Sequence, residues 1–245
     1  MRHELTPKEQ RGVALQKAYY TETAGLYDSM HFSESSTKGH NLACSLMHGL
    51  ALLYQYESIL DLGSGTGRVI RDLRDKLPGV RIVGIEPVAA LREIGYQSGI
   101  ARDSLVEGDA TALNYADGSF DLVCAYGILH HIPNPRLAVE NMLRVAKKAI
   151  FISDGNRFAQ GPYIARLIKL FCHKIGAWPL VNYMKTKGKG YTVSQGDGIM
   201  YSYSVFDDYD YISKHCKTVL LFNLEGGGKH PLTEAPSIGL LGVKA

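Results

Sequence analysis

The chain of 245 residues carries a formal net charge of +3, and 45% of its residues are hydrophobic and 21% charged. These values are typical of a globular protein with one substantial core. The charge is too mild to indicate a nucleic-acid surface, and no apolar run is long enough to cross a bilayer. The N-terminal residues lack the apolar core of a signal peptide, and the four cysteines form no CxxC pair. We therefore expect a cytoplasmic protein with reduced thiols, no nucleic-acid partner and no stable membrane insertion.

The first 56 residues predict a helical extension. The capping box TPKE at residues 6–9 begins a helix that we expect to run to about Tyr20. The following stretch, YYTETAGLYDSMH, is aromatic and polar and contains Gly25, so a bend is expected there. A second helix is expected over residues 37–56. Its apolar positions Leu42, Leu46, Leu50 and Leu53 form one stripe.

From Ser58 the pattern alternates between strand and helix. Apolar strands separated by helices predict a mostly parallel sheet that is covered on both faces. The expected strands are residues 58–62, 81–86, 104–108, 120–126 and 149–154. The expected helices are residues 67–77, 88–97 and 135–145, the last of them capped by Asn134.

After Asp154 the alternation stops, and it returns only near Val205. A helix is expected over 205–215 and strands over 218–224 and 238–243, which suggests an antiparallel pair that closes the sheet. The predicted fold is α/β, doubly wound and Rossmann-like, with a seven-stranded, mostly parallel sheet and an antiparallel edge strand. We expect one domain overall. Its parts are a helical lid or extension (1–56), a cofactor-binding core (57–154), an inserted substrate lid (155–203) and the C-terminal part of the core sheet (204–245).

The stretch ILDLGSGTG at residues 59–67 predicts a strand that enters a tight glycine turn at the start of a helix. Its spacing is GxGxG, whereas the dinucleotide fingerprint is GxGxxG. Glu86 closes the second strand, where a carboxylate can accept hydrogen bonds from both ribose hydroxyls. Asp109 follows the third strand and can meet an adenine amine, and Asp61 can neutralise an ammonium group. Adenine, ribose and ammonium without pyrophosphate indicate S-adenosylmethionine (SAM).

Four motifs carry a resemblance to a known family: LDLGSGTG, VGIEP, GDA and SFDLVCAYGILHHIPNP. In this order they resemble the motifs of class I SAM-dependent methyltransferases of small molecules, over about Ile59–Asp154. The resemblance implies that Tyr126 offers its backbone carbonyl to the methionine ammonium. The segment YYTETAGLYD also resembles the lid helix of such enzymes, so Tyr27 or Tyr19 would cover the cofactor. The other implied cofactor-binding residues are Asp61, Gly63, Ser64, Gly65, Gly67, Glu86, Pro87, Asp109 and Ala110.

Methyl transfer requires an aligned acceptor and a water-free site, and a hydroxyl acceptor must also lose its proton. His130 and His131 follow the fourth strand, and Asp154 ends the neighbouring fifth strand, where it can orient one imidazole. We therefore expect His131 or His130 to be the general base of an O-methyltransferase that yields S-adenosylhomocysteine. The alternative is that the histidines only shape the pocket. Asp154-Gly155-Asn156 faintly resembles metal-dependent catechol-type members, but the remaining ligands are not evident, and we expect no metal.

Substrate choice is expected to lie outside the core, in residues 1–56 and 155–203. Tyrosines suit an aromatic or sugar acceptor, and the lysines of residues 185–190 suit a phosphate or carboxylate on it. The amphipathic stretch Tyr163–Ile175 either roofs the site or lies on a membrane to reach a lipid such as a quinone, and its few basic residues favour the roof. The alternative functions are N- or C-methylation, including a quinone-type ring carbon, and SAM binding without catalysis. A monomer or homodimer is expected. The predicted substrate-binding residues are His31, Tyr191, Tyr201 and Tyr203.

Overall fold

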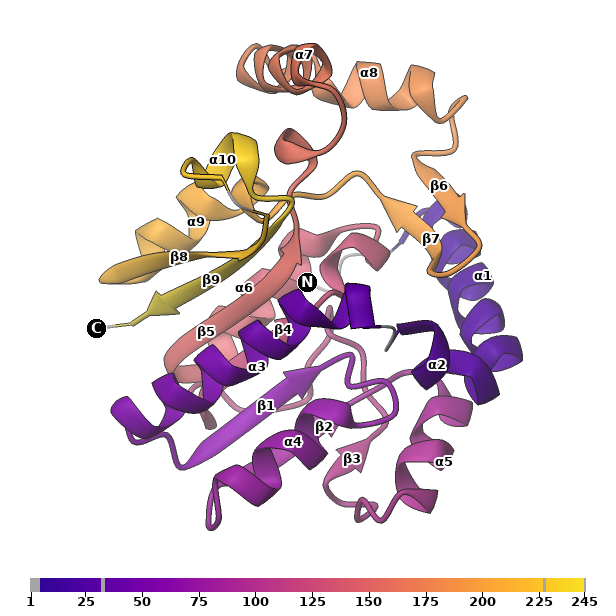
Figure 1. Cartoon of the computed structure of the whole chain (residues 1–245). Helices are drawn as coiled ribbons and strands as arrows, with labels where there is room; N and C mark the ends of the chain where they lie inside the picture. The colour runs from indigo at the N-terminus through magenta and orange to yellow at the C-terminus, as the bar shows by residue number, and fades with distance from the viewer. Residues whose placement is uncertain (1–4, 32–33, 227, 245) are drawn as a thin grey trace.

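A seven-stranded sheet forms the centre of the computed structural model, which describes residues 5–31, 34–226 and 228–244. The strand order is β3-β2-β1-β4-β5-β9-β8, and β1 to β5 are parallel. β9 runs antiparallel to both of its neighbours, β5 and the edge strand β8, which confirms the predicted fold class (Figure 1). The strands are β1 Ser58–Leu62, β2 Arg81–Ile85, β3 Leu105–Val106, β4 Phe120–Tyr126, β5 Ala146–Gly155, β8 Thr218–Glu225 and β9 Ser237–Val243.

Helices cover both faces of the sheet, as expected for buried parallel strands. Successive side chains of β1 point to opposite faces: Ile59 packs in the cluster of α3 and α4, and Leu60 packs in the cluster of α6 and α9. Asn134 precedes α6, but its side chain makes no capping hydrogen bond. The core helices are α4 Arg68–Lys76, α5 Ala89–Gln97, α6 Pro135–Val145, α9 Tyr209–His215 and the short α10 Pro231–Glu234. Single 3₁₀ turns are η2 Leu129–His131, η3 Arg157–Ala159 and η4 Val205–Asp207.

The N-terminal segment is helical, as predicted. The capping box is present: the Glu9 amide donates to Thr6 Oγ1, and the Glu9 carboxylate accepts from the Thr6 amide. The predicted leucine stripe of the second helix is half right: Leu46 and Leu50 pack against the core, whereas Leu42 and Leu53 are 43% and 72% exposed. The fully buried side chains of this helix are Ala43, Cys44, Met47 and Ala51, and they face the sheet. The elements are α1 Pro7–Thr23, η1 Ala24–Leu26, α2 Tyr27–His31 and α3 Glu34–Leu53.

The segment between β5 and α9 contains two helices and a hairpin. α7 Tyr163–Lys174 and α8 Trp178–Lys185 lie next to each other, away from the sheet (Figure 1). The antiparallel hairpin of β6 Tyr191–Ser194 and β7 Gly198–Tyr201 packs against α1. Sequence periodicity predicted α7 but neither α8 nor the hairpin. Within the described residues, no helix has both the length and the apolar character needed to cross a membrane.

Candidate functional site

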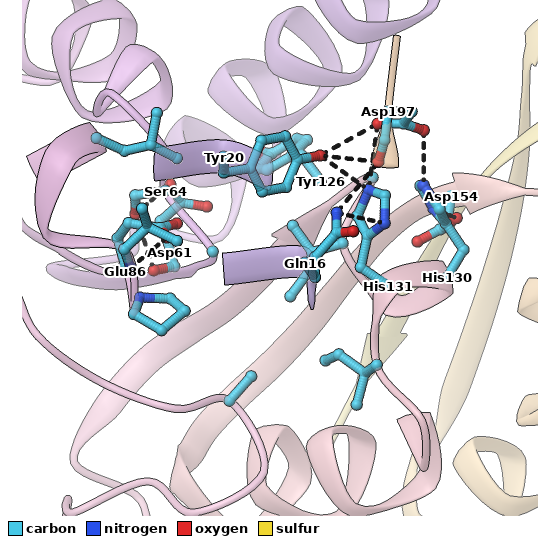
Figure 2. Close-up of a pocket in the computed structure, with 18 of the residues that line it drawn as sticks. Gln16, Tyr20, Asp61, Ser64, Glu86, Tyr126, His130, His131, Asp154 and Asp197 are labelled. Atoms are coloured by element: carbon cyan, nitrogen blue, oxygen red, sulfur yellow. Dashed lines mark hydrogen bonds and ion pairs between the residues drawn. The ribbon is translucent and has the colours of Figure 1, made fainter. Parts of the chain in front are cut away.

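A cavity of about 430 Å³ lies beyond the carboxyl ends of the parallel strands. Its wall combines the loops after β1, β2, β3, β4 and β5 with side chains of α1 and α3 and with the turn of the β6–β7 hairpin. Figure 2 shows two polar groups in this cavity, Asp61, Ser64 and Glu86 at one end and the histidines with Asp197 at the other. The volume suits a drug-sized ligand or cofactor.

The glycine turn after β1 has three residues with positive φ: 64° at Gly63, 55° at Gly65 and 75° at Gly67. Only glycine adopts this backbone at little cost. Gly63, Ser64 and Thr66 line the cavity. Gly65 and Gly67 instead face protein, since an added Cβ would lie 2.7 Å from the Tyr27 hydroxyl and 2.2 Å from Ile100 Cδ1. These two glycines therefore set the path of the turn.

Glu86 is held rigidly at the cavity wall. Its carboxylate accepts hydrogen bonds from the backbone amides of Gly65 (3.0 Å) and Val88 (2.9 Å), and the residue is 5% exposed. Burial raises the pKa of Glu86, and the two amides oppose that shift. The two remaining lone-pair positions can accept hydroxyl donors, as the sequence predicted for a ribose. Pro87, beside it, also lines the cavity.

Asp61 is a buried carboxylate without a cationic partner among the described residues near it. Its Oδ2 accepts from Ser64 Oγ at 2.7 Å, and burial raises the pKa of Asp61 to about 7. Such a group suits a ligand cation, because an ammonium would offset the cost of burying the charge. Tyr126, which ends β4, lines the same region.

Asp109 and Ala110 follow β3 and line the cavity, as predicted for the adenine end. Asp109 Oδ1 accepts from the Thr111 amide and hydroxyl, both at 2.8 Å, so the loop holds this carboxylate in place.

The carboxylate of Asp154 joins the ends of β4 and β5. Its Oδ2 accepts from the Leu129 amide at 2.9 Å, and its Oδ1 lies 2.8 Å from His130 Nδ1. Asp154 is only 3% exposed, so this contact is shielded from water. The structure thus brings together His130 and Asp154, as the strand order predicted.

Asp197, in the hairpin turn, reaches both histidines from the opposite wall. Its two carboxylate oxygens lie 3.2 Å from His130 Nε2 and 3.2 Å from His131 Nε2, and the Tyr20 hydroxyl donates to Oδ1 at 3.2 Å (Figure 2). Burial opposes charge on His130, but the flanking Asp154 and Asp197 outweigh it and raise the pKa of His130 to about 10. Burial likewise opposes the Asp197 carboxylate, yet both histidines hold its pKa well below the usual range.

His131 has a different environment from His130. Its Nδ1 lies 2.6 Å from the carbonyl oxygen of Ile199, which can only accept, and 3.1 Å from Gln16 Nε2; the shorter contact favours a proton on Nδ1. Nε2 faces Asp197 and the Tyr20 hydroxyl. Gln16 ties the hairpin to α1, because its amide donates to the Asp197 carbonyl (3.1 Å) and accepts from the Ile199 amide (2.5 Å).

The same cluster has the composition of a metal site. One ligand atom each from His130, His131 and Asp197 lie within 4.8 Å of one another. Imidazole nitrogens and one carboxylate are ligands that divalent transition metals accept.

Several predicted residues lie away from the cavity. The Tyr19 hydroxyl donates to the Gln195 carbonyl on the hairpin (2.5 Å), whereas Tyr27 lines the cavity as predicted. Tyr191 and Tyr201 pack against each other with ring centroids 5.8 Å apart, and the Tyr203 hydroxyl donates to buried Asp208. None of these three tyrosines lines the cavity, so their side chains do not reach a ligand there. The side chain of His31 lies outside the described residues.

Sequence reasoning missed Asp197, Gln16 and Tyr20. For Asp197 a signal exists: it is the only Asp or Glu in residues 155–203, and it stands between Gly196 and Gly198, as a turn residue would. Gln16 and Tyr20 lie on one face of α1, four residues apart, but nothing in the sequence says which face meets the site.

Comparison with known proteins agrees with this geometry. Residues 60–152 match the family described as "Methyltransferase domain". A demethylmenaquinone methyltransferase of Deinococcus radiodurans is 32% identical over 126 residues, which are 49% of this chain and 51% of that protein. One from Renibacterium salmoninarum is 33% identical over 109 residues, 44% of this chain and 45% of that protein. The chain therefore spans about half the length of these relatives.

Solved structures share the fold at low identity. Magnesium protoporphyrin IX methyltransferase of Synechocystis PCC 6803, with bound SAH, superposes with a TM-score of 0.58 at 12% identity, covering 96% of this chain and 100% of that chain. A possible histamine N-methyltransferase of Thermotoga maritima gives 0.53 at 18% identity, with 93% and 99% covered. At these identities the likeness concerns the fold alone.

Proposed function

We propose that this chain is a class I SAM-dependent methyltransferase that transfers a methyl group from SAM to a hydroxyl oxygen of a small molecule, with His131 as the general base. The observation that carries this assignment is the 2.6 Å contact between His131 Nδ1 and the Ile199 carbonyl oxygen. When the ring is neutral, this contact holds its proton on Nδ1 and leaves the lone pair on Nε2, the nitrogen that faces Asp197 at the cavity wall. A hydroxyl acceptor needs such a base when its oxygen attacks.

The cavity fits the cofactor at its other end. Glu86 offers two lone pairs to the ribose hydroxyls, Asp109 and Ala110 border the adenine position, and the buried carboxylate of Asp61 suits the methionine ammonium. When bound, SAM supplies an electrophilic methyl carbon on a sulfonium. Every other task falls to the protein: orienting the acceptor, excluding water and holding its proton.

His130 has a different task from His131. Asp154 and Asp197 raise the pKa of His130 to about 10, which favours the imidazolium and makes His130 a poorer general base than His131. Between Asp154 and Asp197 it instead holds the hairpin turn against the core. Asp197 must move aside for an acceptor hydroxyl to reach His131 Nε2, and its return would close the cavity to water. Tyr20, hydrogen-bonded to both groups, would follow this movement.

Methylation of a ring carbon in a quinone-type acceptor is a second candidate. The curated relatives from Deinococcus radiodurans and Renibacterium salmoninarum are named demethylmenaquinone methyltransferases. In such a reaction His131 would take the proton of a ring hydroxyl, and the electron-rich ring carbon would attack the methyl group as S-adenosylhomocysteine leaves. The methylated carbon would then lose its hydrogen as a proton while the ring oxygen regains one, which restores the aromatic ring. The same base and the same cavity therefore serve both candidates, and the acceptor decides between them.

Calorimetry with S-adenosylhomocysteine and a screen of labelled methyl transfer to metabolites, including hydroquinones, test these proposals. We expect His131→Ala to lose about 10²–10⁴-fold in kcat while S-adenosylhomocysteine binding is kept. His215→Ala, on the distant helix α9, is the matched control and should remain active. Absence of binding at millimolar ligand would overturn the cofactor assignment. Full activity of His131→Ala would overturn the general base, and binding without turnover on any acceptor would indicate a SAM-binding protein.

A further inference from the structure

Helix α7 turns its apolar face to the solvent, whereas a normal surface helix turns this face to the protein core. Five of its large apolar side chains are exposed by between 46% (Leu167) and 71% (Ile164), Leu170 is half-buried, and no residue of the helix is fully buried. Amphipathic helices of globular proteins turn this face to the core. The outward apolar side chains are Tyr163, Ile164, Leu167, Ile168, Phe171 and Ile175.

The basic side chains of α7 fix this orientation from the protein side. Arg166 donates to the carbonyl oxygens of Gly161 (2.7 Å) and Thr233 (3.1 Å). Lys169 Nζ donates to the carbonyl oxygens of Gln160 (2.8 Å) and Arg157 (3.0 Å). Rotating α7 to bury its apolar face would break these four hydrogen bonds, so the exposure is part of the fold.

Helix α8 extends the same surface. Leu180, Tyr183 and Met184 are 62%, 60% and 62% exposed, and α8 also has no buried residue. The two helices contact each other and project together from the sheet (Figure 1). We call these nine apolar side chains of α7, Ile175 and α8 the α7–α8 surface. None of them lines the cavity, so the roof favoured by the sequence is not what these helices form.

A contiguous apolar surface of this kind marks an interaction site. The charge around it identifies the partner: residues 155–196 contain no Asp or Glu, and four of their seven Lys and Arg residues are exposed, whereas Arg157, Arg166 and Lys169 bond to the protein. Lys174, Lys185, Lys187 and Lys189 are exposed beside the apolar side chains. A second copy of the chain would bring like charges together at such a face, so self-association through it is disfavoured.

We propose that the α7–α8 surface docks this protein onto an anionic lipid bilayer. The two helices lie in the plane of the membrane: their aliphatic and aromatic side chains enter the boundary between headgroups and acyl chains, and the lysines contact anionic headgroups. Tyr163, Phe171 and Tyr183 supply the aromatic rings that favour this boundary. The proposal requires no spanning helix, in agreement with the lengths of α7 and α8.

Docking would also deliver a lipid-soluble acceptor, a consequence that rests on the proposed function. α8 leads through residues 186–190 directly into the hairpin that carries Asp197 to the histidines. The segment that meets the bilayer is therefore continuous with the segment that closes the cavity. An acceptor with a polar ring and a lipid tail would suit this arrangement.

Vesicle flotation with the full chain tests the docking. We expect binding to phosphatidylcholine vesicles that contain phosphatidylglycerol, weakening with salt, and much weaker binding to phosphatidylcholine alone. The variant Ile168→Glu/Phe171→Glu should lose at least about ten-fold in partitioning. Leu52→Glu/Leu53→Glu, which changes two equally exposed leucines on α3, should bind as the wild type does.

A charge comparison completes the test. Lys174→Glu/Lys185→Glu/Lys187→Glu should abolish the preference for anionic vesicles, whereas Lys147→Glu/Lys214→Glu/Lys217→Glu, with the same net charge but at other exposed positions, should keep it. S-adenosylhomocysteine binding should be unchanged in all four variants, which separates docking from the proposed function. The proposal is overturned if the wild type ignores anionic vesicles. It is also overturned if Ile168→Glu/Phe171→Glu binds normally or instead breaks a dimer of this chain.

Discussion

Asp197 Oδ2 lies 3.2 Å from His130 Nε2, although 67 residues separate the two in sequence. The contact joins a hairpin turn of the inserted segment to the loop after β4, across the cavity. Because His130 also contacts Asp154 at 2.8 Å, one imidazolium holds two carboxylates from different parts of the chain. The hairpin is therefore held across the cavity by contacts between charged groups.

Replacing Asp197 tests that statement. Asp197→Asn removes one of the two negative charges beside His130, so the pKa of His130, now about 10, should fall by about one unit or more. NMR titration of the imidazole C–H signals measures it. Asp210→Asn, a change in the first turn of α9, should leave the titration unaltered. An unchanged His130 titration in Asp197→Asn would mean that the hairpin does not rest on the histidines in solution.

The contact should make stability depend on pH in a defined direction. The folded pKa of His130 is raised above its unfolded value, so its stabilisation is complete below about pH 6.5 and is lost as pH rises toward 10. Asp154, whose pKa is lowered by the same contact although burial opposes it, loses its stabilisation as pH falls through its folded pKa. We expect His130→Gln to cost about 3 kcal/mol of unfolding free energy at pH 7 and much less at pH 10. Urea denaturation at both pH values measures this, and a cost independent of pH contradicts it.

Glu86 should matter for cofactor affinity through its charge. Glu86→Gln keeps the shape but weakens the acceptors of the ribose hydroxyls, and we expect S-adenosylhomocysteine to bind about ten- to hundred-fold more weakly. Glu107→Gln is a matched control, because Glu107 is exposed and pairs only with Arg92 among its described contacts. Isothermal titration of both variants compares them; equal affinities would remove Glu86 from the cofactor site.

Asp61 should make cofactor binding depend on pH. Its pKa of about 7 in the free protein means that it is partly protonated at neutral pH. An ammonium beside it favours the ionised form, so the affinity for S-adenosylhomocysteine should rise between about pH 6 and 8, with release of protons. Calorimetry in buffers of different ionisation enthalpy counts those protons. Asp61→Asn should abolish the proton release, and release that persists in this variant would point to another group.

Gly67 is predicted to be a stability residue. Gly67→Ala would place a Cβ 2.2 Å from Ile100 Cδ1 at a φ of 75°, and we expect a loss of about 2–4 kcal/mol. Gly99→Ala has a comparable φ of 86° with nothing within 4 Å, so only backbone strain of about 1 kcal/mol should result. Thermal unfolding measures both. Equal losses would show that contact with Ile100 carries no cost.

The core of the site could be predicted because parallel strands end at one edge of a sheet. Glu86, Asp109 and His130 follow the ends of strands and Asp154 lies at the end of β5, so the strand order brings them to one edge of the sheet. Asp197 could not be predicted in this way. It reaches the site through two helices and a hairpin whose path depends on packing against α1, which no periodicity in the sequence describes.

The incorrect expectations for α3 and α7 have a similar origin, because both depend on which face of a helix meets the protein. For α3 the sequence suggested the leucine row, but the fully buried row is Ala43, Met47 and Ala51, and only Leu46 and Leu50 of the leucines pack beside it. For α7 the sequence showed an apolar face, but not whether that face points inward. The hydrogen bonds of Arg166 and Lys169 fix the direction of that face. Their acceptors are carbonyl oxygens in and beside η3 and α10, whose positions the sequence of α7 does not reveal.

The position of β9 has a consequence for the order of folding. β9 occupies the place between β5 and β8, although β8 precedes it in the chain. During synthesis, β8 (residues 218–225) is made before β9 (residues 237–243). Until β9 is present, β5 has an unpaired edge and β8 lacks the strand with which it pairs. An open edge of this kind invites pairing with other chains. The sheet is therefore completed only after synthesis reaches residue 243, and truncation before this strand should yield an aggregating product.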